Sequence, residues 1–495
     1  METRRIGTKI DFLQYKWVAL TVTTVGTLMS GVDARIVLVG LPSIAQQLGA
    51  GVEQVIWVSQ AYLLASTLGL LLIGRTTDLV GRVRIYNYGF IIFTVGSAFA
   101  AISFSPAELI ASRIVQGVGA SMLITNSTAI LTDATPRKEL GTVLGINNIA
   151  YRIGSITGLT LSGVILSVAD WRALFYINIP IGIFGTAWAH YRLKEISTKD
   201  SGAKMDWAGF LTFSSGLALL LLAITFLSYG ISGYDIGFAM LTSGAALLLF
   251  FIRIEQKTRV APLLDLKLFK IKEFAGGTLA MMIDAISWSG ILIMISFYLQ
   301  IVLGESPLIA GLHLLALDAT FIVLGPISGK LSDRHGTRLF SIVGLVVISV
   351  AFFMLASITP SDASTMVLVS LAVLGVGSGL FVAPNISSIM GSVPANRRGV
   401  AAGFRNTLLN VGDTSSFGLA ILLMSLVIPY GTFNALLQST VPQAQLQASL
   451  QEFIGGFHLA ALALATINVL AIIPAAMAAK KAPTATLQGS LGEGN

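Results

Sequence analysis

The chain lacks cysteine altogether and has only four histidines among its 495 residues. The absence of cysteine excludes disulfide frameworks, thiol catalysis and zinc sites with thiolate ligands. The histidines lie far apart, without the spacing of zinc ligands, so we expect no metal site. The sequence also contains no phosphate-binding loop and no pairing of a nucleophile with a base, so it indicates neither an ATP-driven protein nor an enzyme.

Charged residues are scarce as well. They make up 11% of the chain, while hydrophobic residues make up 54%, and soluble proteins contain about 25% charged residues. Such a chain cannot cover a water-facing surface of ordinary size. We therefore expect an all-α polytopic membrane protein whose main partner is the lipid bilayer.

Fourteen apolar stretches are long enough to cross a bilayer as helices, which takes about 20 residues each. The connections are short and leave no room for a soluble domain, and the first stretch is longer than the core of a cleavable signal peptide. The stretches lie at residues 17–41, 54–73, 85–104, 108–132, 141–167, 173–192, 207–228, 236–254, 274–302, 308–328, 339–358, 364–390, 399–427 and 454–478.

The basic residues predict the orientation of these spans. Of the 31 Lys and Arg, 26 lie in the two tails, in every second connection or at the adjoining end of a span, Arg172 lies at an outer mouth, and four Arg lie deep inside spans. Basic loops stay in the cytoplasm, so this pattern places both termini there and favours the cell (cytoplasmic) membrane. The net charge of +7 then needs no nucleic-acid partner, because the basic loops face anionic lipid.

The chain contains an internal repeat. Residues 74–82 read GRTTDLVGR and residues 329–338 read GKLSDRHGTR, with the same G-x-x-x-D-x-x-G spacing. We interpret residues 1–192 and 274–495 as two six-span bundles, and residues 193–273 as a linker that carries two inserted spans. Repeats of this kind build alternating-access transporters, with the binding site between the halves.

The motifs resemble those of the major facilitator superfamily, in its fourteen-span drug:proton antiporter branch. The segments that carry the resemblance are 32–42 (VDARIVLVGLP), 74–82, 113–120 (RIVQGVGA), 145–163 (G-x8-G-x3-G-L-x2-S-G) and 170–182 (DWRALFYINIPIG). The resemblance implies the major facilitator fold, with two six-helix bundles related by a pseudo-two-fold axis plus two inserted helices. It also implies a monomer that exports small molecules, driven by a proton gradient and without a cofactor.

The two repeated loops are candidates for a cytoplasmic latch. A carboxylate at a helix end can pair with a nearby arginine and with the N-terminus of the next helix. Such a cluster would hold the cytoplasmic side closed in one state; the other interpretation is a turn whose charges only fix the topology. The latch residues are Gly74, Asp78, Gly81 and Arg82, and Gly329, Asp333, Gly336 and Arg338.

The fifth span carries a small-residue stripe that permits close packing of helices. A polar stripe lies on roughly the opposite side, and the thirteenth span has its counterpart. Polar side chains in hydrocarbon are costly, so these stripes either line a cavity or make hydrogen bonds between helices. The packing stripe is Gly145, Gly154, Gly158, Ser162 and Gly163, and the polar stripes include Asn148, Arg152, Asn406, Asn410 and Asp413.

Ionisable residues at membrane depth are functional candidates by default. We predict that Asp33 meets Arg113 and carries the proton, with Arg113 tuning it; a static buried ion pair is the alternative. The further proton-coupling candidates are Asp284, Asp318 and Asp413, and the substrate-cavity candidates are Arg35, Asn148, Arg152, Trp288, Arg405, Asn406 and Asn410.

Three functions follow from this pattern. The first is a secondary exporter of amphiphilic small organic molecules that works by alternating access in exchange for protons. The second is a more specific exporter or flippase for an anionic metabolite or lipid, favoured by the arginines at membrane depth. The third is a membrane sensor that transports nothing. In a glutamine-rich outer segment, residues 428–453, the spacing from Gln443 to Gln451 predicts a short helix at the outer mouth. The segment is expected either to cover the cavity or to tether the last span.

Overall fold

In the computed structural model, all regular secondary structure of the described residues is helical. The described residues are 12–136, 139–196, 206–228, 233–257, 266–359, 363–394 and 398–478. Eleven helices within them are long and apolar enough to cross a membrane. The all-helical membrane fold is therefore confirmed, and the number of fourteen spans stays a prediction.

Helices occupy all fourteen predicted stretches. The first half contains α1 (Phe12–Leu48), α2 (Val52–Val80), α3 (Arg82–Ala101), α4 (Pro106–Ala134), α5 (Leu140–Val168), α6 (Ala173–Tyr176) and α7 (Asn178–Arg192). The middle contains α8 (Trp207–Leu227), α9 (Tyr234–Lys257) and the short helix η2 (Leu266–Lys270). The second half contains α10 (Lys272–Phe297), the π-helical turn η3 (Tyr298–Val302), α11 (Pro307–His335), α12 (Thr337–Leu355), α13 (Ala363–Ser392), α14 (Arg398–Ser425), α15 (Tyr430–Leu437) and α16 (Gln443–Ala478).

Two predicted elements differ in the structure. The sixth span was predicted as one helix, but it is divided at Ile177 into α6 and α7. Pro180 has no N–H group, so the Tyr176 carbonyl loses its helical partner where the division occurs. The glutamine-rich stretch from Gln443 to Gln451 was predicted to form a separate short helix; it forms instead the first turns of the 36-residue helix α16.

The two halves repeat one packing scheme. In the first half α1 packs on α5, α4 packs between α2 and α3, and α7 packs on α3. In the second half the same pairs recur between α10 and α14, between α13 and its neighbours α11 and α12, and between α16 and α12. The halves meet along α5 with α11 and along α2 with α14, which are equivalent pairs under a two-fold relation.

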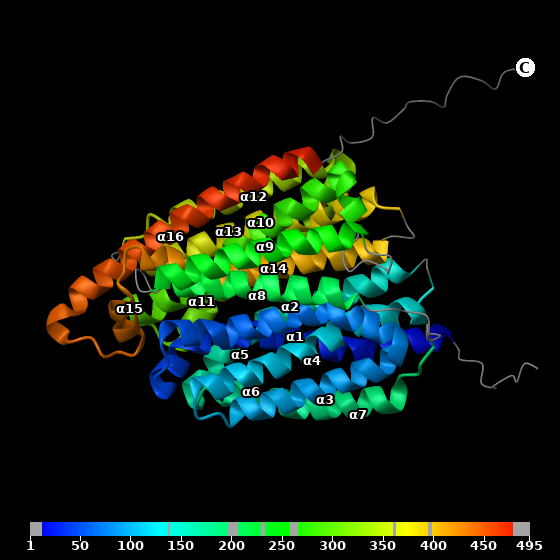
Figure 1. Ribbon diagram of the computed structural model, residues 1–495, viewed down its shortest axis with the longest axis horizontal. Coiled ribbons are helices and arrows are strands. Elements are labelled where there is room, and N and C mark those ends of the chain that lie inside the picture. Colours follow the sequence, from blue (N-terminus) through cyan, green and yellow to red (C-terminus); the bar gives the residue numbers. More distant parts are fainter. Residues whose placement is uncertain are drawn as a thin grey trace, which may run out of the picture.

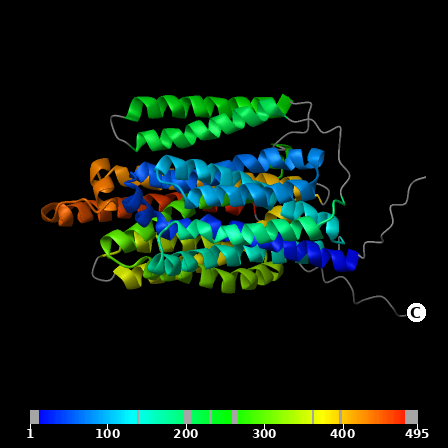
Figure 2. The ribbon, with the colours of Figure 1, turned by 90° about the horizontal axis from the view of Figure 1, so that it is seen from below.

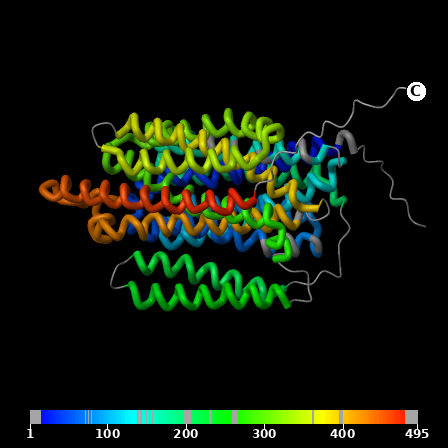
Figure 3. The backbone as a smooth tube through the Cα atoms, turned by 90° about the horizontal axis from the view of Figure 1, so that it is seen from above, coloured from blue at the N-terminus to red at the C-terminus, as the bar shows by residue number. Residues whose placement is uncertain are grey.

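The middle pair of helices lies to one side of this bundle. Figures 2 and 3 show α8 and α9, in green, side by side along one flank. They pack mainly on each other, and α8 also contacts α14 and α2. This placement is the one expected of an insertion between two six-helix units, although the domain boundaries themselves stay a prediction.

The bundle has two distinct ends. Figure 1 shows α15 and the start of α16 at one end, and the start of α1 and the end of α16 toward the other. We call them the α15 end and the termini end. Close contacts between the halves occur near the α15 end, where a Cβ atom on Gly163 of α5 would lie 2.7 Å from the Cα of Leu308 of α11.

Candidate functional site

The centre of the first half holds a fully buried ion pair. The side chains of Asp33 on α1 and Arg113 on α4 are 0% and 1% exposed, and Arg113 Nη1 donates to Asp33 Oδ2 at 2.6 Å. The contact between these two residues is the one predicted from the sequence. Because both charges are removed from water, each depends on the other for compensation.

Further side chains complete the pair. Gln116, one turn after Arg113, donates to Asp33 Oδ1 at 3.3 Å, and Asn178 of α7 donates to the same oxygen at 2.9 Å. Arg113 Nε donates to the Val58 carbonyl of α2 at 3.0 Å, and the guanidinium lies 4.2 Å from the centre of the Tyr62 ring. Donors from α4 and α7 therefore hold the carboxylate of α1, and α2 holds the arginine that pairs with it.

The sequence prediction missed Gln116 and Asn178 as site residues. Gln116 was detectable, since it lies three residues after a buried arginine and so on the same face of α4. Asn178 had a weaker signal, a lone amide two residues before Pro180. The break between α6 and α7 puts it at the first position of α7, from which it reaches Asp33.

A second ion pair connects the two halves. Arg35 Nη1 donates to Asp318 Oδ1 at 3.3 Å and to Oδ2 at 3.2 Å, from α1 to α11. Arg35 and Asp33 are two residues apart, so α1 directs one into the first half and the other toward the second. Arg35 is therefore occupied by a carboxylate in this state, and the predicted roles of Arg35 in the substrate cavity and of Asp318 in proton coupling stay predictions.

The second half holds two further carboxylates in polar surroundings. Asn468 of α16 donates to Asp284 of α10 at 2.9 Å, and Ser289 of α10 donates to Asp413 of α14 at 2.8 Å. Arg405 donates to the neighbouring Asn406 side chain at 2.6 Å. The remaining cavity candidates, Trp288 and Asn410, are half-buried, with Trp288 against the main apolar core.

The polar stripe of α5 is described only in part. The side chains of Asn148 and Arg152 lie outside the described residues, so their predicted place in a cavity stays a prediction. The neighbouring Asn147, which the sequence analysis did not select, is buried and accepts hydrogen bonds from Thr27 of α1 at 3.2 Å and Ser127 of α4 at 3.1 Å. This amide joins three helices of the first half.

The loop at Gly81 contains an ion pair that the sequence did not indicate. Gly81 has a φ of +115° and ends α2, a conformation that glycine adopts without strain. Arg82 pairs with Asp133 of α4. Gly74 lies within α2, and the side chain of Asp78, the predicted partner of Arg82, lies outside the described residues, so that contact stays a prediction. Sequence spacing could not indicate Asp133, because it lies 51 residues away and the fold alone brings it close.

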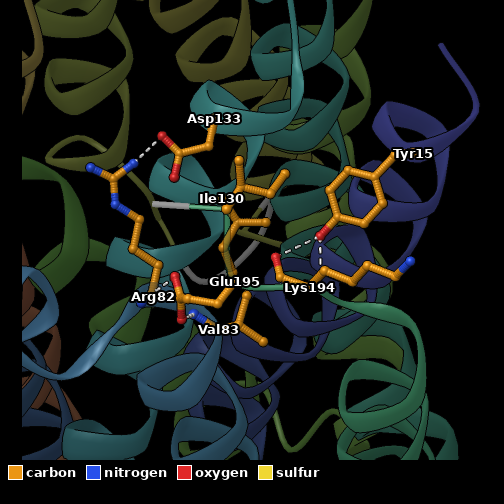
Figure 4. A pocket seen from close by; sticks show the side chains of 8 residues that line it. Tyr15, Arg82, Val83, Ile130, Asp133, Lys194 and Glu195 are labelled. Carbon is orange, nitrogen blue, oxygen red and sulfur yellow. Dashed lines mark hydrogen bonds and ion pairs between the residues drawn. The ribbon is translucent and has the colours of Figure 1, made fainter. Parts of the chain in front are cut away.

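Figure 4 shows the surroundings of Arg82 at the termini end. Glu195, just after α7, accepts hydrogen bonds from the backbone amides of Arg82 at 3.1 Å and Val83 at 3.0 Å, and so caps the N-terminus of α3. Tyr15 of α1 donates to the Lys194 carbonyl at 3.0 Å. The segment after α7 is thereby tied to the loop.

The equivalent loop of the second half is more open. Gly336 has a φ of +89° and ends α11 as Gly81 ends α2, and Gly329 makes only an ordinary contact with Ala383. Asp333 and Arg338 are exposed, and no ion pair joins them among the described residues. The latch would close only in the other state, so its role at this loop stays a prediction.

The small residues of α5 act as predicted, with one exception. A Cβ atom on Gly154 would lie 2.4 Å from the Leu28 carbonyl oxygen of α1, and one on Gly158 would lie 2.5 Å from that of Val32. A Cβ atom on Gly145 would have no neighbour within 4 Å among the described residues, so this glycine is not at a packing position. Ser162 is fully buried, and its hydroxyl has no hydrogen-bond partner among the described residues.

The fold and this buried polar centre define a membrane transporter with two related halves. The chain matches the family model of the Major Facilitator Superfamily over residues 23–417, and it belongs to that family. It is 31% identical over 399 residues to the riboflavin transporter RibZ of Clostridioides difficile, covering 81% of this chain and 86% of that protein.

Exporters are also among the relatives. The multidrug resistance protein Stp of Mycobacterium tuberculosis is 30% identical, over 81% of this chain and 74% of its own. The tetracenomycin C resistance and export protein of Streptomyces glaucescens is 26% identical, over 81% and 75%.

Solved structures share the fold. A bacterial homologue of the human lysosomal transporter Spinster superposes with a TM-score of 0.67 at 16% identity, covering 95% of this chain and 98% of that one. A D-xylose–proton symporter superposes with a TM-score of 0.61 at 13% identity, covering 93% and 97%.

Proposed function

We propose that this protein is a secondary active exporter of amphiphilic small organic molecules, which works by alternating access in exchange for protons. The observation that carries the proposal is the buried pair of Asp33 and Arg113. A carboxylate at membrane depth is costly, so its presence there is by default a sign of a role in transport or coupling. This one is held by donors from two neighbouring helices of its own half.

The coupling follows from the chemistry of the pair. Arginine stays protonated, so only the carboxylate can gain or lose a proton. Protonation of Asp33 removes its attraction to Arg113 and frees α1 and α4 to separate, and deprotonation restores the pair. Because α1 also carries Arg35, the state of Asp33 bears on the ion pair with Asp318 that joins the halves.

The contacts between the halves support alternating access. Ser296 donates to the Leu38 carbonyl at 3.3 Å, Gln300 to the Val39 carbonyl at 3.1 Å, and Asn434 accepts from the Val52 amide at 2.7 Å. These bonds lie in the part of the bundle nearest the α15 end. With both termini in the cytoplasm, the molecule is closed toward the outside, and the opposite movement would open it there.

The class of substrate follows from the relatives and from the interior. Stp and the tetracenomycin C exporter suggest export of organic molecules. The four acids and four arginines predicted at membrane depth balance in charge, so amphiphilic or zwitterionic molecules fit better than strongly charged ones. The second candidate is a transporter for one specific molecule, and the likeness to RibZ makes riboflavin the first to test.

We also propose the finer organisation given by the sequence. The protein has fourteen spans, arranged as two six-helix units with the inserted α8–α9 pair between them in sequence. It lies in the cell membrane, and the working unit is a monomer. Six-helix units that pack in equivalent pairs support this division.

The test is transport by purified protein in proteoliposomes under an imposed pH difference. A panel of amphiphilic cations, zwitterions and anions, with riboflavin among them, is measured with and without the gradient. We expect several amphiphilic compounds to accumulate against their gradients only when the pH difference is present. Accumulation of riboflavin alone would favour the specific transporter, and movement independent of pH would refute proton exchange.

A further inference from the structure

A buried group of polar side chains lies at the α15 end of the second half, away from the pair of Asp33 and Arg113. Glu305 lies between η3 and α11, His313 lies in the second turn of α11, and Ser364 lies at the start of α13. The side chains of His313 and Glu305 are 11% and 14% exposed, in a region whose surroundings are largely apolar. Nothing in the proposed transport cycle uses them.

These three side chains form one hydrogen-bonded chain. Ser364 Oγ donates to Glu305 Oε1 at 2.8 Å, and His313 Nε2 lies 2.9 Å from the same Ser364 Oγ. On its other side His313 Nδ1 lies 2.9 Å from the Ile309 carbonyl oxygen. Since a carbonyl can only accept, Nδ1 must carry a hydrogen.

Counting hydrogens then gives two consistent arrangements. If the Ser364 hydroxyl donates to a Glu305 carboxylate, His313 Nε2 must donate to the hydroxyl, and the imidazole is positively charged. If Glu305 is protonated and donates to the hydroxyl, Ser364 donates to Nε2, and the imidazole is neutral. The two arrangements hold the same number of hydrogens, and no heavy atom has to move between them.

Loss of one hydrogen breaks this chain. With Glu305 ionised and His313 neutral, the single Ser364 hydrogen can satisfy either the carboxylate or Nε2, but not both. One buried polar atom is then left without a partner, which is unfavourable. Glu305 Oε2 already has no hydrogen-bond partner among the described residues, although it lies 3.5 Å from His313 Nδ1, so the positive ring is its main source of compensation.

We propose that Glu305, Ser364 and His313 form a second proton-binding site, in which one proton is shared between carboxylate and imidazole through the serine hydroxyl. The proton moves from Nε2 to Oγ while the Oγ hydrogen moves to Oε1, so the number of protons and the total charge of the site stay constant. Release of the shared proton leaves a net charge of −1 on the three side chains.

Two other titratable residues at this end, His458 and Asp170, have partners of their own. His458 of α16 contacts the Ile358 carbonyl oxygen through Nε2 at 2.8 Å. Asp170 and Arg172, which follow α5, pair with each other at 2.7 Å. The inference rests on the proposed function only for its direction: if the α15 end faces outward, this site receives protons from the outer side.

The test is the titration of the resting protein in detergent by nuclear magnetic resonance, with ¹⁵N-labelled histidine and ¹³C-carboxyl-labelled glutamate. The chain has only four histidines, so the loss of one signal in His313→Gln assigns the ring, and Glu305→Gln assigns the carboxyl. We expect the two signals to change with one common midpoint in the unaltered protein, because they report one shared proton.

Ser364→Ala removes the hydroxyl that transmits the proton, and it should split the common midpoint into two. His335, exposed at the termini end, serves as the control and should titrate identically in every variant. Separate midpoints for His313 and Glu305 in the unaltered protein would overturn the proposal. The midpoints themselves are measured in the unaltered protein, and His313→Gln and Glu305→Gln serve only to assign the signals. The result is independent of transport, so failure here is distinguishable from failure of the proposed function.

Discussion

At the scale of single residues, the four acids predicted at membrane depth each have a partner. Asp33 is held by Arg113, Asp318 by Arg35, Asp284 by Asn468 and Asp413 by Ser289. Only the first of these is completely buried and paired with a charge that is equally buried. Breaking such a pair from one side typically costs about 3–5 kcal/mol, because the remaining charge is uncompensated.

Asp33→Asn tests the role of that pair. Asparagine imitates the protonated acid, so we expect the variant to fold, to lose accumulation driven by a pH difference, and to keep exchange of substrate down its gradient. The measurement is transport in proteoliposomes with and without the gradient. Asp235→Asn, at an exposed aspartate at the start of α9, is the matched control and should transport normally. Gradient-driven accumulation by Asp33→Asn would show that another group carries the proton.

Gly154→Ala tests the close contact between α5 and α1. The added methyl group would lie 2.4 Å from a backbone oxygen that cannot move alone, so we expect a loss of about 1–3 kcal/mol in stability, typical of overpacking. Gly145→Ala is the control on the same helix, because that position is open. Thermal unfolding of the two purified variants gives the comparison, and equal melting temperatures would contradict the packing role.

At this scale the sequence indicated some contacts and could not indicate others. Asp33 and Arg113 were predictable as a pair, because both are charged at membrane depth and such charges seek each other. Arg82 pairs with Asp133, a partner that the sequence did not indicate. Asp133 and Asn178 join their partners only through packing of distant helices, which no local pattern encodes.

At the scale of elements, α15 connects the two halves although it belongs to the second. Tyr430 donates to Glu53 of α2, Asn434 accepts from the Val52 amide, and Gln438 donates to the Ala50 carbonyl at 3.2 Å. The sequence analysis left open whether this outer segment covers the cavity or tethers the last span. These bonds to the start of α2 favour a clasp that closes the α15 end, which must release if that end is to open.

Cross-linking tests the clasp. Gln46 Nε2, in the last turn of α1, donates to Ser439 Oγ, just after α15, at 3.1 Å. The chain has no cysteine of its own. In the double variant Gln46→Cys and Ser439→Cys, oxidation of the two thiols to a disulfide should reduce transport several-fold. A reductant, which cleaves the disulfide, should restore transport. The two single variants, treated in the same way, are the controls. Full transport by protein shown on a gel to be cross-linked would mean that α15 does not need to move.

At the scale of the whole molecule, the arrangement of basic residues predicts the orientation. Lys257 at the end of α9 and Gln445 at the start of α16 are both exposed, and the topology places them on opposite sides of the membrane. Single cysteines at these two positions should therefore react with an impermeant reagent from opposite sides, in intact cells for Gln445→Cys and only after permeabilisation for Lys257→Cys. Labelling from the same side would contradict the predicted topology.

The sequence by itself determined the class of this protein, its helical spans and its internal repeat. The reason is that the bilayer imposes a local rule: any segment that crosses it must be apolar, helical and of a fixed minimum length, and this rule is visible residue by residue. Family membership followed from motifs that are also local, and the match over residues 23–417 bears it out.

Only the tertiary structure decided which polar groups meet. Arg35 was expected in an open cavity, and the packing of α1 on the second half gives it Asp318. Glu305, Ser364 and His313 come from three separate segments and have no shared pattern in the chain. A buried charge selects the partner that lies within hydrogen-bond distance once the helices are packed, and that distance depends on contacts between residues far apart in sequence.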